Sequence, residues 1–103
     1  MTDITTEELK QKLDNKEDFL FIDVREQHEY DEFNLGAKLI PLGTIPSSLS
    51  AINQYKDKEI VIHCRSGARS ANAKNYLMQM GFTNVRNLLG GVLRWIELYE
   101  NAD

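Results

Sequence analysis

Apolar residues along this chain occur either in short continuous runs or at helical spacing. The runs at residues 19–24 and 60–62 are typical of strands buried on both faces, and therefore of a parallel sheet. Two more short strands are predicted, at residues 38–40 just before Pro41 and at residues 84–88. These runs alternate with helical segments along the whole chain.

The first helix is predicted from its start signal. Thr5 fits the N-cap, Glu8 completes a capping box, and the helix should end near Asn15. Further helices are expected at residues 26–33, from Pro46 onward, at residues 70–80 and at residues 92–99. The residues expected to face the core from these helices are Leu9, Leu13, Leu49, Ile52, Ala73, Leu77, Met80, Trp95, Ile96 and Tyr99.

Strands and helices that alternate over short connections predict an α/β fold, in which helices cover both faces of a parallel sheet. A chain of 103 residues supports one hydrophobic core region, and neither an internal repeat nor a linker interrupts it. We therefore expect a single domain over residues 1–103.

Composition and net charge limit the partners and the cellular location expected for this chain. The hydrophobic content of 42% and charged content of 27% are ordinary for a globular chain, and no apolar run approaches the ~20 residues that span a bilayer. The net charge of −4 argues against nucleic acid or an anionic membrane as a partner. The N-terminus lacks a secretory signal, and one cysteine cannot form an internal disulfide, so a reducing, cytoplasmic location is expected.

The charges are unevenly distributed along the chain. Residues 60–96 contain no Asp or Glu but five basic side chains, whereas the remaining residues hold all 16 acids. This segment also holds the only cysteine, Cys64, so the asymmetry favours an anionic substrate. The basic residues are Arg65, Arg69, Lys74, Arg86 and Arg94.

Cys64 lies where the predicted strand 60–62 gives way to a loop and then a helix, the usual ligand position in an open α/β sheet. The amides of residues 65–69 can form an anion-binding nest there, because Gly67 tolerates positive φ. Arg65 and Arg69 add positive charge, so the thiol should ionise readily and stay accessible. A lone cysteine is more often a small buried apolar residue, but this polar loop argues against burial.

Other catalytic arrangements are less consistent with the sequence. His63 is adjacent to Cys64 but should point to the opposite face of the sheet, as a residue whose ring is hydrogen-bonded, and His28 is assigned no role. One cysteine and two separated histidines do not make a metal site. Asp23 and Arg25 are expected to form a structural ion pair, and the carboxylates at 26, 29 and 32 to form a solvated helix face.

Without a neighbouring base, the chemistry must suit a thiolate that is already ionised. Phosphoryl transfer and sulfur transfer both fit this requirement. Cysteine-dependent phosphatases use H-C-x5-R, whereas here four residues separate His63-Cys64 from Arg69. The shorter loop suits a persulfide better than a tetrahedral phosphate.

Several motifs together resemble the single-domain rhodaneses, the thiosulfate sulfurtransferase family. The resemblance covers nearly the whole chain, and the loop at residues 64–70, CRSGARS, carries it most specifically. The other matching stretches are FIDVRE at 21–26, EY at 29–30, GA at 36–37, IPL at 40–42, and LGGV at 89–92 with Trp95. One departure is the stretch FNLGA at 33–37, which is a residue shorter than the family's usual turn and lacks its first Gly and its His.

The resemblance implies a five-stranded parallel sheet with helices on both sides. It implies that Cys64 carries the persulfide, while the loop amides hold the outer sulfur and no organic cofactor or metal is needed. The expected partners are a small anionic sulfur donor such as thiosulfate and an acceptor that is a thiol, cyanide or a carrier protein. The residues expected to bind the donor or sulfur are Arg65, Ser66, Gly67, Ala68, Arg69 and Ser70.

Two alternatives to an independent sulfurtransferase remain. The first is a cysteine-dependent phosphatase or arsenate reductase, since families related in fold use the longer loop. The second is a sulfur-carrier or docking module that turns over little by itself.

Overall fold

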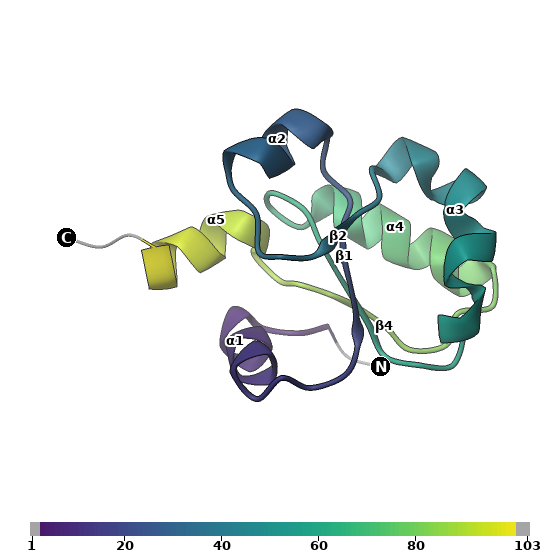
Figure 1. Ribbon diagram of the computed structural model, residues 1–103, viewed down its shortest axis with the longest axis horizontal. Coiled ribbons are helices and arrows are strands. Elements are labelled where there is room, and N and C mark those ends of the chain that lie inside the picture. Colours follow the sequence, from purple (N-terminus) through teal and green to yellow (C-terminus); the bar gives the residue numbers. More distant parts are fainter. Residues whose placement is uncertain (1–2, 101–103) are drawn as a thin grey trace.

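The order of strands and helices in the computed structural model, which describes residues 3–100, follows the predicted alternation (Figure 1). The predicted domain limits at residues 1–2 and 101–103 lie outside the described part. In chain order, the elements are α1 (Thr6–Asp14), β1 (Leu20–Asp23), α2 (Gln27–Glu32), β2 (Lys38–Leu39), η1 (Leu42–Thr44), α3 (Ile45–Ile52), η2 (Asn53–Tyr55), β3 (Ile60–His63), α4 (Ala68–Gln79), β4 (Val85–Asn87), α5 (Gly91–Trp95) and η3 (Ile96–Glu100), which is a π-helical turn.

The strands form a parallel sheet in the order β2-β1-β3-β4. The register pairs Asp23 with His63 across β1 and β3, and Ile62 with Asn87 across β3 and β4. Parallel strands end at the same edge of the sheet, so this pairing brings the ends of three strands together beside Cys64. The predicted α/β class with a parallel sheet is confirmed.

The expected fifth strand is reduced to a single residue among those described. Ile4 pairs in parallel with Leu88 as an isolated bridge, donating its N–H to the Asn87 carbonyl (3.0 Å) and accepting from the Leu89 N–H (2.9 Å). The chain cannot continue along β4, because Thr5 is already the N-cap of α1. Over residues 3–100 the sheet therefore has four strands rather than five.

Two apolar clusters lie on opposite faces of the sheet. The cluster that includes Ile60, Ile62 and Leu77 packs beneath α3 and α4. The cluster that includes Val61, Leu9 and Trp95 packs beneath α1 and α5. Figure 1 shows this division, with α3 and α4 on one side of the strands and α1 and α5 on the other. Helices thus cover both faces, as the near-continuous apolar strands predict.

Most helix boundaries follow the expected local signals. Thr5 and Glu8 form the reciprocal capping box at α1. The helix α4 begins two residues earlier than predicted, at Ala68, because Gly67 rather than a later residue is its N-cap. Two predicted core residues are wrong: Met80 lies past the last turn of α4 and is exposed, and Tyr99 is exposed while its ring packs edge-on against Trp95.

Candidate active site

The loop between β3 and α4 wraps around the sulfur of Cys64. The Gly67 amide donates to Sγ at 3.1 Å and the Ser70 amide at 3.4 Å, and the Ser70 hydroxyl also lies 3.4 Å from Sγ. This curl requires Gly67 to adopt φ +113°, which side chains other than glycine rarely tolerate. Of the predicted nest at residues 65–69, the Gly67 amide contacts the sulfur, and Ser70 adds donors one residue beyond it.

The side chain of Cys64 is nevertheless buried, which the sequence did not predict. Only 1% of the residue is exposed, and it belongs to the cluster beneath α3 and α4. The loop residues that donate hydrogen bonds to the sulfur also cover it. The contacts that stabilise the thiolate therefore restrict the access of a ligand to it. The expectation of an accessible thiol is wrong for this conformation, although the sulfur is hydrogen-bonded rather than held by apolar contacts alone.

Burial and hydrogen bonding act in opposite directions on the thiol. Burial raises the pKa of Cys64, but donors from Ser70, Gly67 and Ser66 outweigh it and hold the pKa below its ordinary value. The sequence predicts a lowered thiol pKa from three sources: the loop amides, the positive end of the following helix and the charges of Arg65 and Arg69. The structure attributes it first to the hydrogen-bond donors of the loop, because these lie directly against the sulfur.

Backbone contacts from the start of α5 hold the loop in place on the side away from the sulfur. The amides of Val92 and Leu93 at the start of α5 donate to the carbonyls of Cys64 and Arg65, both at 3.0 Å. Gly91 lies so close to this backbone that a Cβ there would stand 2.5 Å from the Arg65 oxygen and 2.6 Å from the Cys64 oxygen. With its carbonyls held by α5, the loop can direct amides toward the sulfur.

Asn87, at the end of β4, also contacts this loop. Its side-chain amide donates to the Gly67 carbonyl at 3.2 Å, and its side-chain oxygen accepts from the Ser70 hydroxyl at 2.5 Å. From the sequence, Asn87 was expected only as part of a strand and had no predicted role. No local signal identifies it, because its position depends on the pairing of β4 with β3.

Arg69 is held by a carboxylate rather than left free for a ligand. Its guanidinium donates to both carboxylate oxygens of Glu29, at 2.7 and 2.9 Å. This hydrogen bonding lowers the pKa of Glu29 to about 2. The expectation that Glu29 belongs to a purely solvated helix face is wrong, because α2 lies against the start of α4, and the pair forms across that contact.

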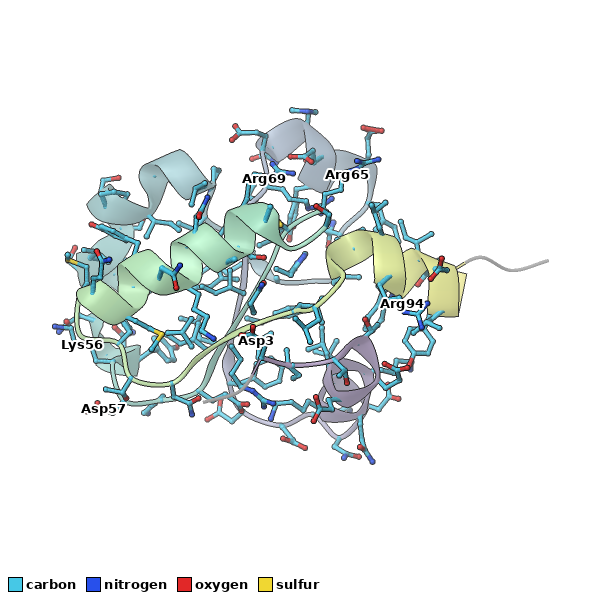
Figure 2. The ribbon with its side chains drawn as sticks, turned by 180° about the vertical axis from the view of Figure 1, so that it is seen from behind. Asp3, Lys56, Asp57, Arg65, Arg69 and Arg94 are labelled. Atoms are coloured by element: carbon cyan, nitrogen blue, oxygen red, sulfur yellow. The ribbon has the colours of Figure 1, made fainter. Side chains whose placement is uncertain are left out.

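The predicted positive segment is largely neutralised by the fold. Arg69, Lys74, Arg86 and Arg94 each form an ion pair with an acid from outside residues 60–96, respectively Glu29, Asp3, Glu59 and Glu97. Within the described residues, only Arg65 of this segment lacks an acidic partner, and its side chain is exposed. Figure 2 shows Arg65 and Arg69 near one another on the same side of the molecule, beside the loop and α2.

Asp23 and Arg25 form the structural ion pair that was expected. The guanidinium of Arg25 contacts both carboxylate oxygens of Asp23, at 2.8 to 3.1 Å, and donates to the Phe33 carbonyl at 2.7 Å. Asp23 is fully buried and Arg25 nearly so. The pair therefore anchors the end of α2 to the carboxyl edge of the sheet.

His63 points away from Cys64, as strand alternation predicts. Its ring lies 5.2 Å from the Phe21 ring, on the α1 and α5 side of the sheet. The expectation that its ring is hydrogen-bonded is wrong: among the described residues neither ring nitrogen has a hydrogen-bond partner, and the Asp23 carboxylate is 3.7 Å away. Burial lowers the pKa of His63 to about 4, although the charge of Asp23 opposes this. His63 is therefore unsuited to act as a base for Cys64.

A pocket of about 250 Å³ opens beside the loop, between α2 and the last helical segment. Arg65 and Glu29 form its polar side, and Phe33, Leu93 and Ile96 are among its apolar lining residues. A larger pocket of about 380 Å³ lies at the other end of the molecule, near Lys56. Figure 2 places Lys56 far from Arg65, so the larger pocket is not part of the sulfur site.

The turn that departs from the family pattern is closed by Asn34. Its side-chain oxygen accepts from the Gly36 amide at 2.9 Å, and the Tyr30 hydroxyl donates to the Ala37 carbonyl at 3.0 Å.

Within residues 3–100 there is no cluster of His, Cys, Asp or Glu suited to a metal ion. No helix of the described part is long and apolar enough to cross a membrane.

Comparison with known proteins identifies the family. The family model for the rhodanese-like domain matches residues 5–98. The chain belongs to the rhodanese-like domain family. It is 42% identical over 96 residues to a sulfurtransferase of Allochromatium vinosum (92% of this chain, 88% of the relative) and 40% identical over 94 residues to the putative sulfurtransferase YtwF of Bacillus subtilis (90% and 88%).

Solved structures agree with this assignment. A rhodanese-like domain protein of Staphylococcus aureus superimposes with a TM-score of 0.82 at 38% identity, covering 92% of this chain and 91% of that one. The fold expected from the resemblance is therefore confirmed, except that the fifth strand is reduced to the single bridge at Ile4.

Proposed function

We propose that this chain is a sulfurtransferase that moves sulfane sulfur from thiosulfate, or a similar anionic donor, to a thiophilic acceptor through a persulfide on Cys64. The observation that carries the proposal is the set of donors from Gly67 and Ser70 within 3.4 Å of one sulfur atom. The chain belongs to the rhodanese-like domain family, and similar proteins named sulfurtransferases support the same chemistry.

The reaction consists of two displacements at sulfur. The Cys64 thiolate attacks the outer sulfur of thiosulfate, a new S–S bond forms, and the donor S–S bond breaks as sulfite leaves with its electron pair. An acceptor thiolate or cyanide then attacks the outer sulfur, and Cys64 leaves as the thiolate. Neither step requires an external base or oxidant, which agrees with a lowered thiol pKa and with a histidine on the opposite face.

The loop residues have distinct roles in this proposal. Gly67 and Ser70 hold the charge on sulfur, while the exposed guanidinium of Arg65 attracts the donor. The backbone of Ser66 and Ala68 completes the loop around the outer sulfur, and Arg69 fixes the loop through Glu29. A reducing compartment such as the cytoplasm would keep the single thiol free.

Intact-mass spectrometry tests the proposal directly. Protein freed of reductant and treated with excess thiosulfate should gain the mass of one sulfur atom, and Cys64→Ser should gain none. Cyanide or a small thiol should then remove the added sulfur and restore the original mass. If the wild type gains no mass under donor excess, transfer from thiosulfate is not its activity.

A carrier or docking module is the second candidate, because a thiol that is only 1% exposed should react slowly with free donors and acceptors. Such a module would accept sulfur once but exchange it slowly with free donors and acceptors. Steady-state turnover against a panel of donors and acceptors separates the two, because a carrier shows the mass change without sustained turnover. Hydrolysis of a small aryl phosphate would instead identify a phosphatase.

A further inference from the structure

The Ser70 hydroxyl faces more acceptors than it can satisfy. It lies 2.5 Å from the Asn87 side-chain oxygen, 3.2 Å from the Gly67 carbonyl and 3.4 Å from Cys64 Sγ. A hydroxyl has one proton to donate, so it cannot donate to Asn87 and to the sulfur at the same time. The distances favour Asn87 as the acceptor in this conformation.

The orientation of the Asn87 amide is fixed by its other contact. The Gly67 carbonyl can only accept, so the nitrogen of the Asn87 side chain must face it, at 3.2 Å. The oxygen of that amide is then the atom that faces Ser70. Asn87 therefore presents an acceptor, and not a donor, to the hydroxyl beside the sulfur.

Asn87 is also held firmly in place. Its backbone amide donates to the Asp3 carboxylate at 3.0 Å, and Asp3 is paired with Lys74 at 2.6 Å. Its backbone carbonyl accepts from the Ile4 amide at 3.0 Å. With Asn87 buried and Ser70 fully buried, water has little room to replace either partner.

We propose that Asn87 is a positioning residue that competes with Cys64 for the proton of Ser70. This rests on the proposed persulfide chemistry. When the negative charge is on Sγ, the hydroxyl turns toward the sulfur. When Sγ carries the transferred sulfur, the charge moves to the outer atom, Sγ becomes a weak acceptor, and Ser70 donates to Asn87 instead. The buried hydroxyl thus keeps an acceptor in both states of the cycle.

The competition predicts that removing the Asn87 acceptor lowers the pKa of the Cys64 thiol. Asn87→Leu removes the competing acceptor, so Ser70 donates more fully to the thiolate and the pKa of Cys64 should fall, by roughly half to one pH unit. A residue that merely supports the loop would act in the opposite direction, because a looser loop holds the thiolate less well. The effect should also depend on Ser70 and vanish in a Ser70→Ala background.

The experiment is a titration of the thiolate by its ultraviolet absorbance in four proteins: the wild type, Asn87→Leu, Ser70→Ala and the double variant. Cys64 is the only cysteine, so Cys64→Ser gives the tyrosine background. Asn84→Leu, a change of the same kind just before β4, is the control and should leave the titration unchanged. A lower pKa in Asn87→Leu that is absent from the Ser70→Ala pair supports the proposal.

Every other pattern overturns it, whether the pKa rises, does not move, or falls equally in both backgrounds. Should Asn87→Leu fail to fold, Asn87→Asp provides the test, since it keeps an acceptor toward Ser70 and adds charge. Its thiol pKa should equal or exceed that of the wild type, and a fall would contradict the competition. Because no sulfur donor is present, this outcome is separate from the mass experiment on which the proposed function depends.

Discussion

Glu29 and Arg69 form a two-point ion pair that joins α2 to the first turn of α4, although the residues are 40 positions apart in the chain. The carboxylate orients the guanidinium and compensates most of its charge. Arg69 therefore fixes the geometry of the sulfur loop, while the neighbouring Arg65 remains available to a ligand.

We expect Glu29→Gln to remove an acid-sensitive part of the stability. The pKa of Glu29 is about 2 in the folded chain against an ordinary 4.5, so the unfolded state binds the proton first. The contribution is complete above pH 4.5 and is lost as the pH falls toward 2. It amounts to at most ~3 kcal/mol, and partial exposure of Arg69 reduces this. Urea unfolding at pH 7, 4 and 3 should show wild type and variant converging, whereas parallel pH curves would exclude this role.

Arg65→Ala should weaken donor capture without damaging the fold. Its exposed charge acts on the dianion at long range, so KM for thiosulfate should rise about three- to tenfold and the difference should shrink at high salt. Removal of the paired Arg69 should instead lower the thermal midpoint. Arg94→Ala, an exposed arginine paired with Glu97, is the matched control and should leave KM unchanged. Equal KM values for Arg65→Ala and the control would remove Arg65 from the donor site.

Gly91→Ala should displace the sulfur loop. The new methyl group would overlap the backbone of Cys64 and Arg65, and φ is +56° there. We expect a loss of about 2–4 kcal/mol in unfolding free energy together with loss of persulfide formation. Gly43→Ala meets nothing within 4 Å and is the control, with little change in either measurement. Normal persulfide formation in Gly91→Ala would mean that α5 does not control the loop.

His63→Leu should improve stability under mildly acidic conditions. His63 stays neutral in the folded chain, with its pKa lowered to about 4, but takes up a proton near pH 6.5 when unfolded. Stability is thus lost as the pH falls below 6.5. Between pH 7 and pH 5 the wild type should lose roughly 1–2 kcal/mol that the variant keeps. Thermal unfolding at both pH values measures this, and the prediction fails if the two proteins lose the same amount.

Features fixed by neighbouring residues were predictable from the sequence. The capping box of Thr5 and Glu8, the positive φ of Gly67 and the Asp23–Arg25 pair each involve residues at most three positions apart, so their geometry follows from residue type. The strands at β1 and β3 were identified for the same reason. Their apolar runs show where the sheet passes through the core.

Features that depend on packing were not predictable. Glu29 meets Arg69 only because α2 lies against α4, and Asn87 reaches Gly67 only through the register of β4 with β3. The burial of Cys64 likewise depends on how tightly its loop closes, which a pattern of residue types does not determine. The excess positive charge of residues 60–96 does not persist as a positive surface, because acids distant in the chain pair with most of its bases.

The single-residue bridge at Ile4 has a consequence for self-association. By occupying the amide of Leu89 and the carbonyl of Asn87, Ile4 blocks the exposed border of β4 against a strand from another molecule. The opposite border, β2, has only two residues and offers a poor template. Removal of residues 1–4 would uncover the β4 border and favour edge-to-edge aggregation of the shortened protein.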